Sequence, residues 1–76
     1  MANIKIISFG RLKEIIGSEL EWEAENSDEL LNQLNEKFPL LKDLKLRVAV
    51  NQKIISENTD LKNNDVVALM PPYSGG

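Results

Sequence analysis

The sequence predicts an α+β domain, in which a mixed sheet of about five strands carries one main helix across a single face, with a short helix beside it. The chain has 76 residues, 42% of them hydrophobic, which suits one small domain. Residues 19–25 alternate between acidic and apolar side chains, as a half-buried strand does. An amphipathic helix is predicted by four apolar residues at helical spacing, namely Leu30, Leu31, Leu34 and Phe38.

The N-terminal part of the chain predicts a strand, a short helix and a second strand. Residues 4–9 are rich in β-branched side chains and predict the first strand. Apolar residues then recur at helical spacing until Gly17, which predicts a short helix over residues 11–16. The alternating segment 19–25 predicts the second strand, with Leu20, Trp22 and Ala24 on its buried face.

The main helix is expected over residues 27–37. Asn26 suits the N-cap position, and Glu29 suits the reciprocal acidic position three residues later. Pro39 ends the pattern, because the residue before a proline avoids helical dihedral angles. This helix is expected to lie across the sheet.

Three further strands are expected in the C-terminal half. Residues 46–51 predict one strand, and a tight turn at Gln52-Lys53 leads into a short strand at residues 54–55. The following polar segment is expected to be a loop anchored by Leu61. The continuous apolar run at residues 66–70 is typical of a central strand covered by a helix.

The order of these elements predicts a particular arrangement of the sheet. The first and last strands are both apolar, so we expect them to pair in parallel at the centre of the sheet. This is the β-grasp, or ubiquitin-like, arrangement. We expect one β-grasp domain over residues 1–70 and a flexible tail over residues 71–76. Phe9, Trp22 and Phe38 are expected in the core.

Composition disfavours several classes of function. The chain has twelve acidic and nine basic residues, for a net charge of −3, which disfavours binding to nucleic acid or to an anionic membrane. It has no Cys and no His, which disfavours a metal site and triad catalysis. Residues 1–5 do not suit a signal peptide, and no apolar run is long enough to span a bilayer. We therefore expect a cytoplasmic protein.

Two surface features are open to more than one interpretation. The acidic face of the second predicted strand could meet a basic partner. We favour the interpretation that its glutamates are solvated and protect an edge strand from pairing. Apolar surface around Met70 is a candidate docking patch. The acidic face consists of Glu19, Glu21, Glu23 and Glu25.

The C-terminal tail carries the most distinctive chemistry. Its two prolines stiffen the exit from the last strand, and the two glycines could thread a narrow cleft. The Gly76 carboxylate is a poor electrophile, but coupling to AMP would provide a leaving group. Attack by sulfur would then leave a thiocarboxylate, and attack by a lysine would leave an amide. The tail is predicted to bind the partner through Pro71, Pro72, Tyr73, Ser74, Gly75 and Gly76.

The chain resembles the MoaD family, the small, sulfur-carrying subunits of molybdopterin synthase, over nearly its whole length. The most specific match is the ending Pro-Pro-x-Ser-Gly-Gly at residues 71–76. Three upstream segments also resemble the family: Phe9-Gly10-Arg11-Leu12-Lys13-Glu14-Ile15-Ile16-Gly17, Val50-Asn51-Gln52, and Leu61 followed by Asp65, Val67 and Ala68.

The resemblance implies a sulfur carrier in molybdenum cofactor biosynthesis. An ATP-dependent adenylating enzyme would activate Gly76, and a sulfur donor protein would convert it to a thiocarboxylate. The tail would enter the active site of the synthase large subunit and donate sulfur to cyclic pyranopterin monophosphate. Two small subunits would flank a dimer of large ones in a heterotetramer. The chain would bind no cofactor itself, since the activating enzyme uses the ATP and the large subunit supplies the catalytic groups.

Three alternatives remain open at this stage. The chain could be a sulfur carrier for thiamine thiazole synthesis, with the same fold and adenylation chemistry. It could be a ubiquitin-like protein modifier, whose Gly76 would become linked to a lysine. It could also be an interaction domain with an inert tail.

Overall fold

A mixed sheet of five strands forms the centre of the protein, with the strand order β2-β1-β5-β3-β4. The computed structural model describes residues 1–71, except for the side chain of Asp43. β1 and β5 pair in parallel at the centre, and the other neighbouring strands pair antiparallel. The elements are β1 (Ala2–Ser8), α1 (Leu12–Ile16), β2 (Glu19–Ala24), α2 (Ser27–Lys37), η1 (Pro39–Asp43), β3 (Arg47–Val50), β4 (Lys53–Ile55) and β5 (Val66–Met70).

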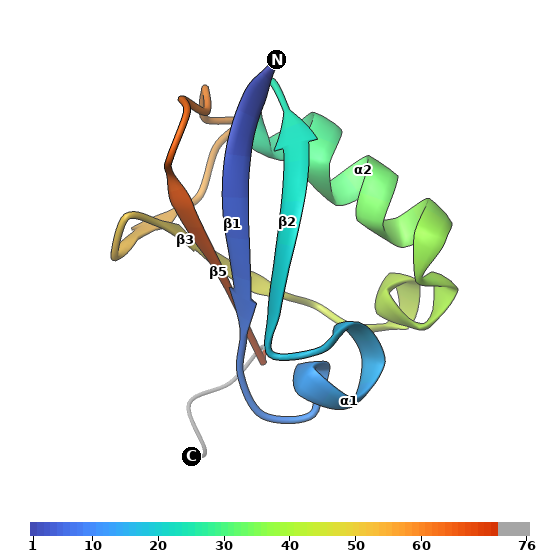
Figure 1. The fold of residues 1–76 in the computed structure, drawn as a ribbon. Helices are drawn as coiled ribbons and strands as arrows, with labels where there is room; N and C mark the ends of the chain where they lie inside the picture. Colours follow the sequence, from blue (N-terminus) through green and yellow to red (C-terminus); the bar gives the residue numbers. More distant parts are fainter. Residues whose placement is uncertain (72–76) are drawn as a thin grey trace.

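This arrangement confirms the predicted α+β class, the parallel central pair and the main helix. α2 lies along one side of the sheet, and α1 follows the end of β1 (Figure 1). Within residues 1–71 no helix is long and apolar enough to cross a membrane.

The core lies between α2 and the face of the sheet that it covers. β1 alternates between buried and exposed residues, and Ile4 and Ile6 are 4% and 1% exposed. Leu30 and Leu34 of α2 are fully buried against this face. Leu61, the predicted loop anchor, is also buried. The periodicities of strand and helix therefore place apolar side chains in one core.

The start of α2 differs in detail from the predicted reciprocal cap. The Asn26 side chain accepts a hydrogen bond from the Glu29 amide at 2.8 Å, as expected of an N-cap. The Asn26 cap is thus as predicted. The Glu29 carboxylate, however, accepts a hydrogen bond from the amide of Glu25 at 2.9 Å, one residue before the predicted partner Asn26. After Phe38, Pro39 begins the 3₁₀ helix η1, an element that the sequence analysis did not predict.

The prediction that Phe9 lies in the core is wrong, because the Phe9 side chain is 44% exposed. Ser8, the last residue of β1, is 2% exposed, and its hydroxyl donates to the carbonyl of Gly17. Successive side chains of a strand point to opposite faces, so the side chain of Phe9, the next residue, points away from the core. Trp22 and Phe38 are only partly buried, packed against the edge of the core.

The turn between β3 and β4 lies one residue earlier than predicted. Asn51 and Gln52 occupy it, with φ angles of 50° and 72°. Positive φ at both central residues is the requirement of a two-residue type I′ hairpin. Lys53, placed in the turn by the sequence analysis, is instead the first residue of β4.

Candidate docking face and tail exit

The chain leaves the sheet at the end of β5, beside the end of β1. The Phe9 amide donates to the Leu69 carbonyl at 3.2 Å and holds the turn after β1 against β5. Gly10 has a φ of +60°, and a Cβ atom there would lie 3.0 Å from Cγ of Pro71. Gly10 therefore allows a close approach that a larger residue would oppose. The exit of the chain is defined as far as Pro71.

Only the first of the predicted tail residues belongs to the described part of the chain. Pro71 is half-buried against Gly10. The other predicted site residues, Pro72, Tyr73, Ser74, Gly75 and Gly76, lie outside the described residues. Their role in partner binding, and that of Gly76 in chemistry, stays a prediction.

The face of the sheet opposite α2 is apolar over four strands, and we call it the open face. The strand pairings place Ile7 beside Ala68, Ala68 beside Ala49, and Ala49 beside Ile54. These four residues form one row from β1 to β4. A hollow of about 700 Å³ lies over this row. Its lining residues are Ile7, Phe9, Ala49, Asn51, Gln52, Ile54, Val66, Ala68 and Met70.

Large apolar side chains are exposed on the open face. Ile54 is 61% exposed and Phe9 is 44% exposed, while Met70 is half-buried. The predicted patch around Met70 is thus part of a wider apolar surface that reaches the tail exit at Pro71. Phe9 was expected in the core because the first strand was predicted to extend one residue too far. The exposure of Ile54 depends on which face of the sheet α2 covers, and no local pattern indicates it.

The β2 side of the open face is acidic. Glu21 is paired with Lys5 in register, and Glu19 is paired with Ile7. The Glu19 carboxylate forms an exposed ion pair with Lys5 at 3.2 Å, which adds little stability. The open face therefore combines an apolar area over β5, β3 and β4 with a row of carboxylates on β2.

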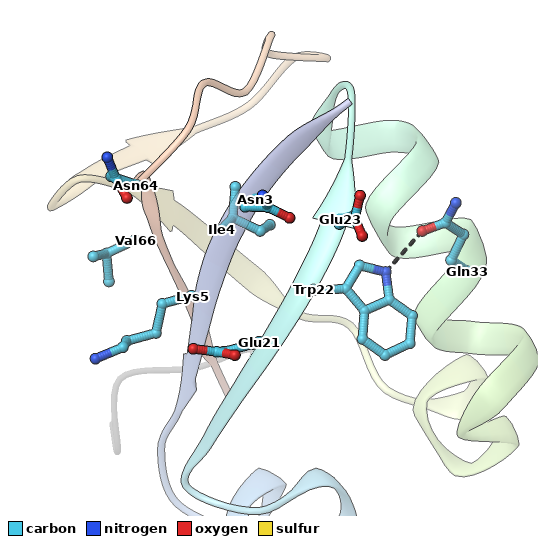
Figure 2. Close-up of a pocket in the computed structure, with 9 residues that line it drawn as sticks. All are labelled: Asn3, Ile4, Lys5, Glu21, Trp22, Glu23, Gln33, Asn64 and Val66. Carbon is cyan, nitrogen blue, oxygen red and sulfur yellow. Dashed lines mark hydrogen bonds between the residues drawn. The ribbon is translucent and has the colours of Figure 1, made fainter.

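A second hollow, of about 980 Å³, lies over β1 and β2. Figure 2 shows Trp22 of β2 reaching toward Gln33 of α2, with Glu21 and Glu23 on the same strand. The indole Nε1 donates to Gln33 Oε1 at 2.7 Å. Amide, carboxylate and ammonium groups line this hollow, and no three His, Cys, Asp or Glu residues within the described chain are placed to hold a metal ion. Its full lining is Asn3, Ile4, Lys5, Glu21, Trp22, Glu23, Gln33, Asn64 and Val66.

The model of the ThiS family matches residues 6–76, which is nearly the whole chain. The chain belongs to the ThiS family. The match begins within β1 and includes the lining of the apolar hollow and the tail.

Relatives of this ThiS-family chain include sulfur carrier subunits of molybdopterin synthase. The protein of that name from Dictyostelium discoideum is 36% identical, over 95% of this chain and 94% of its own length. Its namesake from Escherichia coli is 34% identical, over 96% and 99%.

Solved structures of similar proteins share the β-grasp arrangement. Subunit 1 of the molybdopterin-converting factor from Helicobacter pylori, solved in a complex of subunits 1 and 2, is 33% identical with a TM-score of 0.75. That comparison covers 97% of this chain and 99% of the other. Small archaeal modifier protein 1 from Methanosarcina acetivorans is 28% identical with a TM-score of 0.82, over 100% and 98%.

Proposed function

We propose that this protein is a sulfur carrier in molybdenum cofactor biosynthesis, acting as the small subunit of molybdopterin synthase. The observation that carries this proposal is the similarity to sulfur carrier subunits over 95% and 96% of the chain. The ending Pro-Pro-x-Ser-Gly-Gly of the chain itself supports the same function. The structure adds that this ending begins at one end of the sheet, beside an apolar face. A carrier needs both a reactive end and a surface that its enzymes recognise.

The Gly76 carboxylate is the proposed site of chemistry. An ATP-dependent adenylating enzyme joins the carboxylate to AMP and releases pyrophosphate. Sulfur delivered by a donor protein at the oxidation level of sulfide then attacks the acyl carbon, AMP leaves, and a thiocarboxylate remains on Gly76. This product donates its sulfur to cyclic pyranopterin monophosphate, water takes up the acyl group to restore the Gly76 carboxylate, and two turnovers supply the two sulfurs of the dithiolene.

The open face is the proposed docking surface for the large subunit. The related subunit from Helicobacter pylori was solved together with subunit 2, which supports a second-subunit partner here. Phe9 and Ile54 offer exposed apolar area, and Phe9 lies next to the tail exit. Docking on this face would hold the partner beside Pro71, where the tail begins. We propose two small subunits on a dimer of large subunits.

Intact mass spectrometry tests the proposed chemistry. The protein is incubated with ATP, an adenylating enzyme and a sulfur donor, with a variant lacking Gly76 as the control. We expect a mass increase equal to the replacement of one oxygen by sulfur, in the full chain only. Thermal unfolding of the two chains should be nearly the same, because the core ends before the tail. The proposal is wrong if the full chain gains no sulfur while a known carrier does so under the same conditions.

A second candidate function is protein modification. The 28% identity to small archaeal modifier protein 1 favours it, because the same acyl-AMP could be attacked by a lysine amine. Conjugates of higher mass, absent for the variant lacking Gly76, would support this function. Sulfur transfer to cyclic pyranopterin monophosphate in the presence of the large subunit would support the role in molybdenum cofactor biosynthesis. Sulfur transfer in thiazole synthesis alone would show that the chain is a sulfur carrier for thiamine synthesis.

A further inference from the structure

β2 is an edge strand, so one side of its backbone has no strand partner among the described elements. The register pairs Ile7 with Glu19, and the next pair along is Ser8 with Ser18, where the Ser8 amide donates to the Ser18 carbonyl at 3.1 Å. In antiparallel pairs, hydrogen-bonded and non-hydrogen-bonded positions alternate. Leu20 and Trp22 therefore bond to β1, and the backbone groups of Glu19, Glu21 and Glu23 point away from the sheet.

The bonding of β1 gives the same result independently. The Lys5 amide donates to the Asp65 carbonyl at 3.0 Å, on the β5 side of β1. Lys5 is opposite Glu21 in the register, so this pair makes no hydrogen bond between β1 and β2. The outward amide and carbonyl of Glu21 are available to an added strand.

The two faces of β2 have different chemistry. The side chains of Glu19, Glu21 and Glu23 are exposed on the open face. On the other face, Leu20 and Trp22 are only half-buried. The Trp22 indole bonds to Gln33 (Figure 2), and the Lys37 ammonium lies 5.4 Å from the Trp22 ring centroid. An added strand would thus meet carboxylates on one face and apolar side chains on the other.

Charge decides which kind of strand fits. A second copy of β2 along this edge would place glutamates beside glutamates, and such like-charge pairs are destabilising. Lys5 is 3.2 Å from Glu19, and the structure shows no ion pair for Glu21 or Glu23 among the described residues. A strand with lysine or arginine at alternate positions would place a cation beside each of these carboxylates.

The sequence favoured glutamates that only protect this edge from pairing; against that interpretation, we infer that the free edge of β2 binds an extended segment of a partner protein in which basic and apolar residues alternate. The segment adds a sixth strand to the sheet. Its basic side chains lie beside Glu19, Glu21 and Glu23, and its apolar side chains pack against Leu20 and Trp22. This site is separate from the apolar hollow over β5, β3 and β4, and the inference does not rest on the sulfur-carrier function.

Titration with synthetic peptides tests this inference. The probe is a capped peptide in which lysine and valine alternate, and the control peptide has the same composition with its lysines grouped at one end. We expect the alternating peptide to bind at least about tenfold more tightly. Amide hydrogen exchange should slow at Glu19, Glu21 and Glu23. It should change little at Leu20 and Trp22, whose amides already bond to β1.

A charge-reversal variant makes the test specific to this edge. Glu21→Lys should weaken binding of the lysine–valine peptide about tenfold, because its new ammonium group would lie beside a lysine of the peptide. Glu14→Lys, an exposed position on α1, changes the net charge equally and should leave binding of the lysine–valine peptide unaffected. Thermal unfolding checks that both variants fold.

Three results would each overturn the inference. The first is equal binding of the alternating and grouped peptides, which would indicate non-specific attraction to an acidic protein. The second is equal loss of binding in Glu14→Lys and Glu21→Lys. The third is exchange protection on the open face, at Ile54, without protection of the three glutamate amides.

Discussion

Asn26 determines where α2 begins. Its backbone is extended, with φ −152° and ψ 171°, and its side-chain oxygen accepts the Glu29 amide. The first amides of a helix have no partner within the helix, so this bond satisfies one of them. A single side chain thus connects β2 to the helix that covers the core.

Replacement of Asn26 by alanine should destabilise the fold. Loss of an N-cap side chain costs about 1 kcal/mol, which lowers the melting temperature of a domain of this size by about 4–8 °C. Asn32→Ala is the matched control, because Asn32 is exposed within α2. Alanine is well tolerated in helix interiors, so this variant should lose no stability. Circular dichroism melts compare the two. An equal loss in both variants would show that Asn26 acts through something other than its cap.

At the scale of elements, the β3–β4 hairpin depends on a turn that only some residues adopt easily. Asn51 tolerates positive φ, and its side chain also joins the turn to β5. Its Nδ2 donates to Asp65 Oδ1 at 2.9 Å, and its Oδ1 accepts the Val66 amide at 3.0 Å. Gln52, with φ 72°, has no comparable hydrogen bond among those found within residues 1–71. The second turn position is therefore the strained one.

Replacement of Gln52 by glycine should stabilise the hairpin. A side chain in the left-handed region costs about 1 kcal/mol, and Asn-Gly is a preferred type I′ pair. We expect a gain of about 0.5 kcal/mol in the free energy of unfolding, after the greater flexibility of glycine in the unfolded chain is counted. Urea unfolding measures it. Gln52→Ala retains a Cβ atom, so a similar gain in that variant would contradict the strain argument.

At the scale of the whole molecule, α2 covers one face of the sheet, and the described residues leave the open face uncovered. Burial of Leu30, Leu34, Ile6 and Leu69 on the first face supplies the core. On the second face, the exposed side chains of Phe9 and Ile54 add little to stability while they face water. Exposed apolar surface that is not needed by the core commonly marks a protein interface.

Ile54→Lys tests the open face as a docking surface. Ile54 is 61% exposed, so the free energy of unfolding should change by no more than about 0.5 kcal/mol. Binding to the large subunit should weaken at least about tenfold, because a lysine would be desolvated in an apolar interface. Isothermal titration calorimetry measures this affinity.

Leu40→Lys is the matched control for the docking test. Leu40 is 66% exposed and lies on η1, outside the open face. We expect wild-type affinity for this variant. Unchanged binding by Ile54→Lys, or equal weakening by both variants, would show that the large subunit docks on another surface.

Local patterns were sufficient to predict the strands, the two α-helices and the fold class, but not η1. Alternation in residues 19–25 and helical spacing from Leu30 to Phe38 report directly on one strand and one helix, because each period depends only on neighbours along the chain. The apolar first and last strands indicated the central parallel pair. The sequence of the tail likewise indicated a reactive glycine end, which stays a prediction for Gly76.

Tertiary structure decided which surfaces stay exposed. The sequence shows that Phe9 and Ile54 are apolar, but their exposure depends on strand register and on which face α2 covers. Likewise, the alternation of β2 predicts its acidic face, whereas the outward direction of the Glu21 amide depends on its pairing with Lys5. These properties arise from contacts between residues far apart in the chain, so no local period encodes them.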